Sequence, residues 1–361
     1  MDYKLFRSGW MCFKNPEERD CCMNRHTPRI RDVANVAGVS TATVSRALSN
    51  PDVVSPAALE AVRAAVQKTG YTINQAARNL RQQRTMGVVA LVPNLANPFF
   101  SRILAGVSAV LAPAGYNLLV VDTQGPGISR HIAKTLDRSR ADGLIVFDGL
   151  LPAADLQPGG FLPPIVMACE WIDGLAGPRI RIDNASGARL AIAHLVRLGH
   201  RRIGHLLGPD DNVLARARAE GVHAELAACG LPIRPDWFFA GDFSLDSGRR
   251  CAGEWMAMPD RPTAVFCASD EMACGFIGEV QRRGFRVPQD VSVVGFDDIE
   301  LVDHITPALT TIRQPRRAIG ETAARVMVAL IAGDDPEPRD TVLPVELIER
   351  NSTAAPGLAH T

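Results

Sequence analysis

Long apolar runs are missing from the sequence. The longest, Val326–Gly333, is far shorter than the roughly 20 residues that a membrane helix needs. The N-terminal residues also lack the continuous apolar segment of a signal peptide. We therefore expect a cytoplasmic protein with no membrane partner. The remaining composition, with 47% hydrophobic and 22% charged residues in a chain of 361, is that of a folded protein with ample material for a core.

The cysteines are scattered along the chain. The eight cysteines show no disulfide framework, so in a chain of this length we expect free and mostly buried thiols. Cys12, Cys21 and Cys22 lie near His26, but their spacing matches no zinc-finger pattern. A zinc site there is the minor alternative.

Catalytic motifs are also missing. The sequence contains no G-x-x-x-x-G-K-[ST], no G-x-G-x-x-G after its first strand, no H-E-x-x-H and no G-x-S-x-G. Asp297 and Asp298 invite an acid–base interpretation, but neighbours at a strand end point to opposite sides and need not share a proton. His194, His200 and His205 have arginine and apolar neighbours, which favours structural or surface histidines over metal ligands. We therefore expect no catalytic residue, no metal and no cofactor.

Charge is balanced over the whole chain but not along it. The sequence has 39 basic and 39 acidic residues, yet residues 27–84 hold eight basic residues against three acidic ones. A basic segment attached to an acidic remainder favours contact with a polyanion. A solvated charged surface is the alternative explanation.

Residues 27–70 are predicted to form three short helices. The first covers Ile30–Ala37, and Gly38 supplies the tight turn that ends it. Ser40 caps the second, Thr41–Leu48, and Ser55 with Pro56 begins the third. Two helices joined by a short glycine-containing turn are typical of a helix-turn-helix. The second helix exposes small or hydrogen-bonding side chains that suit a DNA groove, namely Thr41, Ala42, Ser45 and Arg46.

From residue 87 the chain becomes a series of strand-then-helix units. The predicted strands are Gly87–Val92, Asn117–Val121, Gly143–Phe147, Pro164–Ala168, Ile203–Leu207, Ala264–Cys267 and Val291–Gly295. Helical patterns follow most of them, as in Phe99–Leu111, Ala185–Leu198, Ala215–Ala228 and Glu271–Arg283. Apolar strands that alternate with helices predict α/β subdomains with parallel sheets covered on both faces. The length favours two subdomains, with a ligand site between them beyond the carboxyl ends of the strands.

Residues 27–71 resemble the DNA-binding head of the LacI/GalR family of transcriptional regulators. Segments at 97–100, 182–208, 262–275, 287–299 and 307–315 resemble its periplasmic-binding-protein-like effector domain, in the same order. The sequences at 241–244 and 310–320 are most similar to its cytidine- and ribose-type repressors. The resemblance implies these parts: an N-terminal extension 1–26 that we expect to be disordered, a helix-turn-helix domain 27–72, a hinge helix and linker 73–85, an effector-binding and dimerisation domain 86–355, and a tail 356–361.

The resemblance also implies a set of DNA contacts. Thr41 and Ala42 match base-reading positions, and Arg46 matches an arginine suited to guanine. The chain has Ile73 where the family usually has proline before the hinge helix, and Leu80 matches a leucine that enters the minor groove. Other residues match positions near DNA or the hinge: Arg31, Ser40, Thr43, Ser45, Asn74 and Ala77. The hydroxyls of the serines and the threonine contact phosphate or only cap the helix.

In the larger domain the resemblance implies an effector pocket. Arg218 and Asp297 match its charged residues, and Ser269 stands where ribose binders often carry asparagine. The remaining matching positions are Asn97, Phe99, Phe100, Glu170, Trp171, Phe243 and Gln314. Aromatic rings there would stack on a sugar or base, and polar groups would bind hydroxyls.

The sequence therefore predicts a repressor that acts as a homodimer on double-stranded operator DNA. A small sugar or nucleoside between the two subdomains is expected to control its affinity for the operator. The C-terminus has no leucine heptad, which favours a dimer over a tetramer. Two alternatives remain: a sugar- or nucleoside-binding solute receptor without DNA function, and an enzyme that uses Asp297, Arg218 and Glu170 in the cleft.

Overall fold

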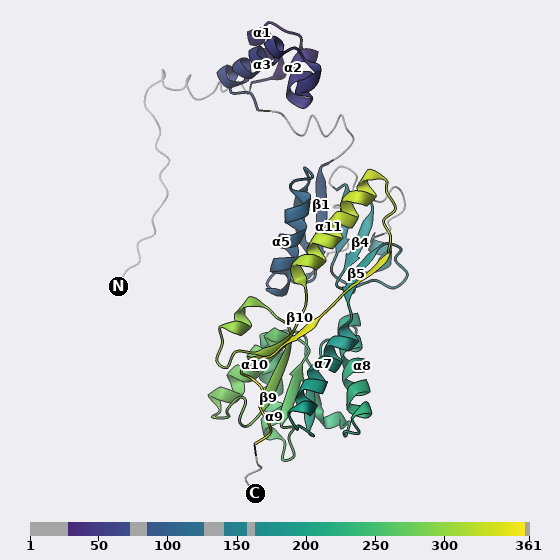
Figure 1. Ribbon diagram of the computed structural model, residues 1–361, viewed down its shortest axis with the longest axis vertical. Coiled ribbons are helices and arrows are strands. Elements are labelled where there is room, and N and C mark those ends of the chain that lie inside the picture. Colours follow the sequence, from purple (N-terminus) through teal and green to yellow (C-terminus); the bar gives the residue numbers. More distant parts are fainter. Residues whose placement is uncertain (1–27, 73–84, 126–140, 157–162, 358–361) are drawn as a thin grey trace, which may run out of the picture. The chain divides into compact units, whose positions relative to one another are not determined.

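The computed structural model describes residues 28–72, 85–125, 141–156 and 163–357 (Figure 1). The predicted N-terminal extension and most of the predicted hinge, with Asn74, Ala77 and Leu80, lie outside these residues. The chain divides into two compact units, Met1–Arg81 and Gln82–Thr361, and each is described here by itself. In the described residues no helix is both long and apolar enough to cross a membrane.

The N-terminal unit is a bundle of three helices, as the sequence predicts. They are α1 (Ile30–Ala37), α2 (Thr41–Ser49) and α3 (Pro56–Thr69). A 3-10 turn, η2, at Pro51–Val53 joins α2 to α3. Their core is made of small and β-branched side chains: Val33, Ala34, Val44, Ala47, Val62 and Ala65.

Local signals set the ends of these helices. Gly38 follows α1 with φ of 67°, a left-handed conformation that glycine adopts without strain. The Ser40 hydroxyl accepts a hydrogen bond from the Thr43 amide at 3.1 Å, and Ser55 accepts one from Ala58 at 3.3 Å. Both serines therefore cap their helices as predicted.

The larger unit contains two six-stranded sheets. The first has the order β11-β5-β4-β3-β1-β2 and the second β12-β10-β9-β8-β6-β7. The first comprises β1 (Gly87–Val92), β2 (Asn117–Asp122), β3 (Gly143–Val146), β4 (Ile165–Ala168), β5 (Arg179–Ile182) and β11 (Asp340–Leu343). The second comprises β6 (Ile203–Leu206), β7 (Phe238–Phe239), β8 (Ala264–Cys267), β9 (Ser292–Asp297), β10 (Thr310–Arg313) and β12 (Glu346–Ile348).

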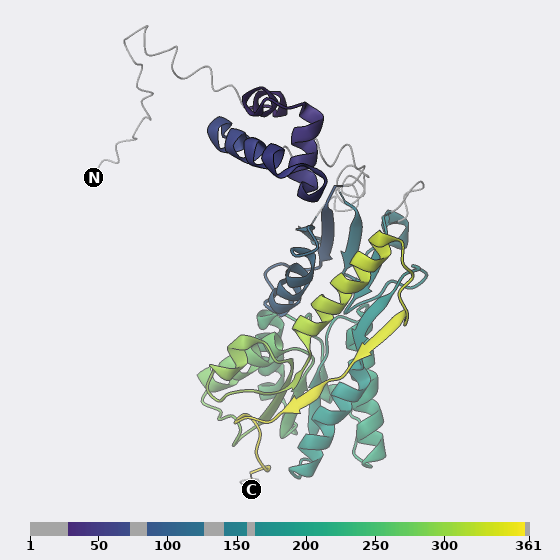
Figure 2. The ribbon, with the colours of Figure 1, turned by 45° about the horizontal axis from the view of Figure 1, so that its top comes forward.

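Helices pack in pairs beside these sheets (Figures 1 and 2). In the first subdomain α5 (Phe99–Leu111) contacts α11 (Arg316–Ala332). In the second, α7 (Asn184–Arg197) contacts α8 (Val213–Ala228), and α9 (Leu245–Ala257) contacts α10 (Asp270–Arg282). Short 3-10 turns lie at η3 (Ala153–Leu156), η4 (Pro235–Trp237) and η5 (Glu300–Asp303). The central strands are buried apolar runs because helices cover both faces.

The chain crosses between the subdomains three times in the described residues. The crossings join β5 to α7, β10 to α11, and β11 to β12. Figure 1 shows the last of them as the yellow segment that leaves one subdomain and enters the other. Each subdomain takes elements from distant parts of the sequence, so three short connections join the two subdomains. The subdomains can change their relative orientation about these connections.

The sheets are parallel as predicted, except at one edge of the second sheet. β12 pairs with β10 in the antiparallel direction, with Thr311 opposite Ile348. The sequence analysis did not identify β5, β7, β10, β11 or β12. These strands have two to four residues each, and four of them lie beside a crossing, so no long apolar run marks them.

Glycines allow the helix pairs to approach closely. A Cβ on Gly320 of α11 would lie 2.0 Å from the Ile103 carbonyl oxygen of α5, and one on Gly106 would lie 2.3 Å from the Arg317 carbonyl oxygen. Backbone atoms cannot move aside as side chains do. This contact therefore requires glycine on both helices.

The close contact predicts a large effect for a single methyl group. We expect Gly320→Ala to lower the free energy of unfolding by about 1–3 kcal/mol, because α5 and α11 must separate. Gly253→Ala is the matched control, since a Cβ there has no neighbour within 4 Å. It should raise stability by up to about 1 kcal/mol through helix propensity. Urea unfolding of both variants checks this, and equal stabilities would contradict it.

Candidate effector cavity and DNA-binding surface

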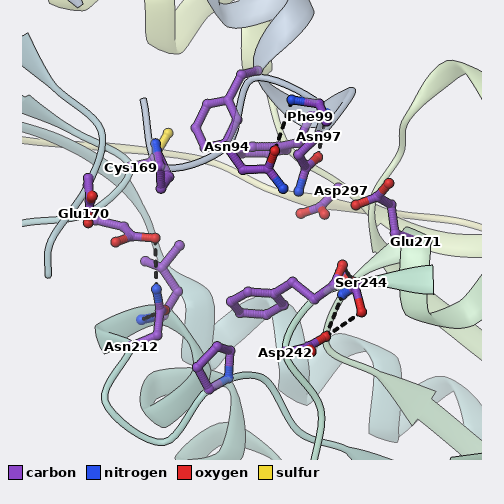
Figure 3. Close-up of a pocket in the computed structure, with 18 of the residues that line it drawn as sticks. Asn94, Asn97, Phe99, Cys169, Glu170, Asn212, Asp242, Ser244, Glu271 and Asp297 are labelled. Carbon is purple, nitrogen blue, oxygen red and sulfur yellow. Dashed lines mark hydrogen bonds between the residues drawn. The ribbon is translucent and has the colours of Figure 1, made fainter. Parts of the chain in front are cut away.

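A cavity of about 380 Å³ lies where the carboxyl ends of parallel strands from both sheets meet (Figure 3). Residues after β1, β2, β3 and β4 line one side of it, and residues after β6, β7 and β8 and at the end of β9 line the other. Parallel α/β sheets place ligands at these strand ends. The fold therefore builds the cavity between the subdomains, as predicted.

Eight of the ten predicted effector residues line this cavity. They are Asn97, Phe99, Phe100, Glu170, Arg218, Phe243, Ser269 and Asp297. Trp171 and Gln314 are not among the lining residues. Trp171 packs against a core cluster that includes residues of β3 and β4, and Gln314 donates a hydrogen bond to Asp297. Ser269 caps α10, since its hydroxyl accepts a hydrogen bond from the Met272 amide at 3.2 Å.

Arg218 is a buried cation at the floor of the cavity. Only 2% of the residue is exposed. Its Nε donates to Asn184 Oδ1 at 2.9 Å, its Nη1 donates to the Ala268 carbonyl at 2.5 Å, and the guanidinium lies 3.8 Å from the ring centroid of Phe296. Burial lowers the pKa of Arg218, while the charge of Asp297 raises it. No described residue accepts a hydrogen bond from Nη2.

Asp297 lies opposite this cation at the end of β9. Its Oδ1 is 3.9 Å from Arg218 Nη1 and accepts a hydrogen bond from Gln314 Nε2 at 2.6 Å. Burial raises its pKa to about 6, against the opposing effects of Arg218, Gln314 and Arg316. Its φ is 122°, a conformation costly for a residue with a Cβ. The surrounding structure must therefore hold this loop in place.

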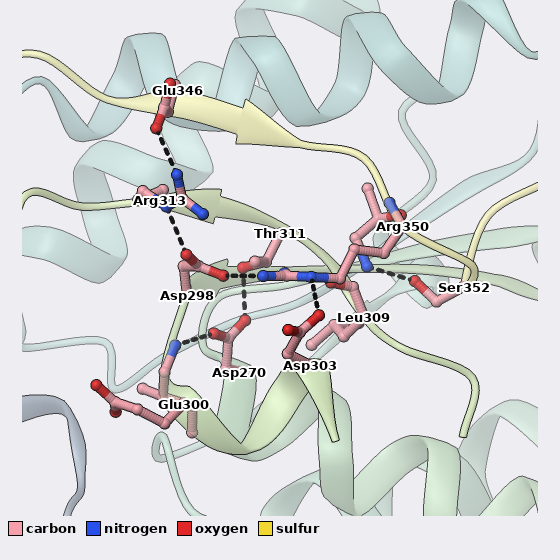
Figure 4. A network of polar contacts seen from close by, with 12 residues as sticks. Asp270, Asp298, Glu300, Asp303, Leu309, Thr311, Arg313, Glu346, Arg350 and Ser352 are labelled. Carbon is pink, nitrogen blue, oxygen red and sulfur yellow. Dashed lines mark hydrogen bonds and ion pairs between the residues drawn. The ribbon is translucent and has the colours of Figure 1, made fainter. Parts of the chain in front are cut away.

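A network around Asp298 supplies that support (Figure 4). Arg350 Nη2 donates to Asp298 Oδ1 at 2.8 Å, and Arg313 Nε donates to Asp298 Oδ2 at 2.6 Å. Arg350 also pairs with Asp303 at 3.0 Å, and Arg313 with Glu346 at 2.9 Å. Burial alone would raise the pKa of Asp298, but the two arginines hold it below its usual value. Asp297 and Asp298 thus have separate partners, as the sequence predicts.

Direct contacts join the two subdomains beside the cavity. Glu170, after β4, accepts a hydrogen bond from Asn212 Nδ2 of the second subdomain at 2.8 Å. Burial raises the pKa of Glu170, and its bonds from the Gly149 amide and Asn212 oppose that. On another side, Arg102 of α5 pairs with Glu300 of η5. The cleft therefore has its own contacts between subdomains.

Aromatic rings make the apolar part of the lining. Phe99 and Phe100 begin α5 and meet edge to face at 5.1 Å. Phe243 follows β7 with φ of 67°, and Arg218 lies 5.9 Å from its ring centroid. Rings beside amides and charges are suited to a ligand with a flat apolar face and polar edges.

Sequence reasoning missed several polar lining residues. They are Asn94, Gln124, Asp148, Asn212, Asp242, Ser244, Asp246 and Glu271. Most follow a strand directly or within a few residues. Because ligands bind at the carboxyl ends of parallel strands, these residues could have been identified as candidates. The sequence does not show which of their side chains face the cavity.

The three histidines considered in the sequence are buried and contact other protein groups. His200 bridges Thr263 and Ser292, and His194 contacts Thr353. Burial lowers the pKa of His205 to about 4. The five described cysteines are free, and three are buried, as predicted: Cys169, Cys251 and Cys267. Cys12, Cys21, Cys22 and His26 lie outside the described residues.

The N-terminal unit presents the predicted reading surface on α2. Thr41, Ala42 and Arg46 are exposed, whereas Val44 and Ala47 are buried. The Ser40 hydroxyl lies 2.9 Å from that of Thr43, and Ser45 is half-buried. Arg31 is exposed on α1. An exposed helix face with small and hydrogen-bonding side chains is compatible with insertion into a major groove.

Comparison with known proteins agrees with this division. Residues 29–74 match the model of the "Bacterial regulatory proteins, lacI family", and residues 192–353 match a "Periplasmic binding protein-like domain". The HTH-type transcriptional repressor CytR of Escherichia coli K12 is 36% identical over 328 residues, which cover 90% of this chain and 96% of CytR.

Solved structures extend the similarity. A lac repressor dimer bound to operator and the anti-inducer ONPF is 30% identical with a TM-score of 0.81, over 91% of this chain and 99% of that one. The transcriptional regulator CelR in complex with cellobiose is 32% identical with a TM-score of 0.69, over 90% and 99%.

A helix-turn-helix unit joined to a two-subdomain cavity of this kind defines a DNA-binding regulator controlled by an effector. The chain belongs to the LacI family of bacterial regulatory proteins. It is a DNA-binding repressor with a periplasmic-binding-protein-like effector domain, and not an enzyme. The alternatives of a solute receptor without DNA function and of a cleft enzyme are therefore excluded.

The network around Asp298 predicts a strong effect of Arg350. Its side chain and that of Asp298 are 13% and 11% exposed. We expect Arg350→Met to destabilise the protein by about 2–4 kcal/mol, because it leaves a nearly buried carboxylate with one cation fewer. Arg317→Met is the control, since its ion pair with Glu321 lies on an exposed helix face and Arg317 is 67% exposed. Thermal unfolding checks this, and equal midpoints would contradict it.

Proposed function

We propose that this repressor binds a pseudo-palindromic operator as a homodimer, and that a small sugar or nucleoside in the cavity controls its affinity for the operator. The observation that carries the effector class is the pairing of Arg218 and Asp297, both of the second subdomain, beside the aromatic rings that line the cavity. A CelR structure contains cellobiose, a sugar, in support of this class. A regulator of DNA works where the DNA is, so we propose a cytoplasmic location.

For DNA recognition we propose separate roles on α2. Arg46 reads guanine, and Ala42 offers a methyl contact to a base such as thymine. Thr41 reads a base edge beside them. Ser40, Thr43 and Ser45 contact phosphates while capping or supporting the helix, and Arg31 adds a phosphate contact. Asn74, Ala77 and Leu80 are proposed to form the hinge that enters the minor groove.

For the effector we propose that Asp297 accepts two hydroxyl groups and that Arg218 donates to the ligand through Nη2. Asn97 and Glu170 bind further polar groups. The rings of Phe99, Phe100 and Phe243 flank the apolar face of the ligand. Gln314 and Ser269 hold Asp297 and the start of α10 in place, and Trp171 supports the cavity wall.

Binding between the subdomains provides the coupling. A ligand that contacts both sides favours one relative orientation, and a coupling free energy of about 1–3 kcal/mol changes operator affinity roughly 5–150-fold. The lac repressor structure with operator and ONPF is a dimer, which supports the proposed homodimer.

The proposal is tested by fluorescence anisotropy of the protein with promoter fragments, at several salt concentrations and with a panel of nucleosides and pentoses. Tight, salt-dependent binding to one palindromic fragment that one ligand alters is the expected result. Weak binding that is equal on all fragments and unaffected by every ligand would overturn it.

Arg46 allows a sharper prediction on the identified operator. We expect Arg46→Ala to weaken binding by about 1–3 kcal/mol and to relax sequence preference at one base pair. Arg63→Ala removes the same charge from an exposed position on α3, so its effect should be smaller and uniform across sequences. Competition against single-base operator variants measures both. A loss of affinity in Arg46→Ala without any loss of preference would contradict base reading.

Asp297 predicts how effector affinity depends on pH. The charged groups that face it are Arg218 of α8, Arg316 of α11, and Asp270 and Glu271 of α10. Its raised pKa of about 6 means that the ionised form predominates at pH 7 and the protonated form at pH 5.

A ligand that donates hydroxyls to the ionised carboxylate should therefore bind about tenfold more weakly at pH 5 than at pH 7. Asp297→Asn should bind more weakly at pH 7 and lose most of this pH dependence. Glu220→Gln, on an exposed position of α8, should retain it. Calorimetric titration at both pH values measures the ratio, and an unchanged ratio in Asp297→Asn would contradict the assignment.

A further inference from the structure

The cavity lining carries far more negative than positive charge. Among its described residues, six carry carboxylates and one carries a basic group. The carboxylates belong to Asp148, Glu170, Asp242, Asp246, Glu271 and Asp297, and the basic group to Arg218. An incoming anion would therefore meet like charge on most sides.

Four of these carboxylates already have partners within the protein. Asp148 accepts from the Thr123 hydroxyl at 2.5 Å and from the Leu150 amide at 2.9 Å. Asp242 accepts from the Ser244 hydroxyl at 2.5 Å, and Glu170 accepts from Asn212. Asp246 is 87% exposed at the rim and pairs with Arg249. Glu271 remains for a ligand, together with Oδ2 of Asp297, whose Oδ1 already accepts from Gln314.

Glu271 is the least engaged of all. It is the second residue of α10, is about half-buried, and has no hydrogen bond or ion pair with any described residue. Burial raises its pKa, and the neighbouring charge of Asp297 raises it further. Figure 3 shows Glu271 and Asp297 on the same side of the cavity, near Asn97. The carboxylate of Glu271 and Oδ2 of Asp297, to which no described side chain donates, are the open acceptors on this side.

The single basic group cannot offset this pair. Arg218 is buried, stacks on Phe296, and already gives hydrogen bonds to Asn184 and Ala268. The positive charge of Arg218 is already partly offset by Asp297, whose Oδ1 lies 3.9 Å from Arg218 Nη1. What it offers a ligand is the open Nη2 donor, which suits a hydroxyl, carbonyl or ring nitrogen.

The side-chain amides near the pair present donors. Asn94 Oδ1 accepts from the Ala96 amide at 2.9 Å, and Asn97 Oδ1 accepts from the Phe99 amide at 2.8 Å. With their oxygens occupied, both side chains have their Nδ2 groups left for the cavity. A hydroxyl can accept from an amide and donate to a carboxylate at the same time. A phosphate dianion, the main form of a phosphate ester at pH 7, can only accept.

We propose that the cavity takes an uncharged ligand rich in hydroxyl donors and rejects its phosphate ester, and that Glu271 with Asp297 makes this distinction. The inference rests on the proposed function and narrows it to free sugars and nucleosides, as against sugar phosphates and nucleotides. Glu271 is a specificity residue: it accepts a donor from the ligand and repels a phosphate group.

The test is calorimetric titration of the full chain with two matched pairs: ribose with ribose 5-phosphate, and cytidine with cytidine 5′-monophosphate. We expect at least one unphosphorylated member to bind, and its phosphate ester to bind on the order of 100-fold more weakly. Glu271→Gln keeps the shape of the side chain and removes its charge. Glu271→Gln should reduce about tenfold the ratio between the affinity for the unphosphorylated ligand and that for its ester. Glu220→Gln removes a charge from an exposed position of α8 and should leave this ratio unchanged.

The remaining outcomes separate the two levels of the argument. If a phosphate ester binds as tightly as its partner, the charge selection is overturned while a sugar or nucleoside effector stands. If the esters are rejected but Glu271→Gln leaves the ratio as it was, the role of Glu271 is overturned. If no member of either pair binds, the proposed effector class fails, and the inference fails with it.

Discussion

A buried guanidinium is the constraint around which the effector domain is arranged. Arg218 is removed from water, and an unpaired charge there would cost several kcal/mol. The structure compensates with a carbonyl, an amide, an aromatic face and a carboxylate that stands slightly too far for a hydrogen bond. One nitrogen of the group, Nη2, has no acceptor among the residues that the structure describes. A folded domain tolerates such an incomplete arrangement where a ligand completes it.

The same constraint explains the strain beside it. Asp297 must reach toward Arg218 from the end of β9, and it does so with φ of 122° and a second unfavourable residue, Asp298, at 54°. Arg313 and Arg350 hold that second carboxylate, and both lie beside or after crossings between the subdomains. The binding loop is thus fastened to the segments about which the subdomains reorient. Ligand contact and subdomain orientation therefore depend on the same short stretch of chain.

How far the sequence predicts this structure depends on how local the signals are. The head is predicted to within a residue, because Gly38, Ser40 and Ser55 act on their own helices. β1 and β8 are identified because each is a continuous apolar run that a helix follows. β11 and β12 are not, because nothing within them reveals that β5 and β10, far away in the sequence, complete their hydrogen bonds.

The cavity shows the same limit at the level of single side chains. Family resemblance identifies Arg218 and Asp297, whose positions are fixed by motifs. It does not distinguish Glu170, which faces the cavity, from Trp171, which packs on the core one residue later. Glu271 is missed because it follows a buried aspartate in a helix whose first turn reads as an ordinary acidic N-terminus.

The contacts between the subdomains also constrain how an effector acts. Glu170 with Asn212, and Arg102 with Glu300, join the two sides of the cleft. A ligand can change the relative orientation only by the difference between its affinities for the two arrangements. Contacts that it makes to one subdomain alone add affinity and no coupling. Ligand contacts that bridge Arg218 or Asp297 to the strand ends of the first subdomain produce the coupling. They do so because they compete with or reinforce the existing contacts between the subdomains.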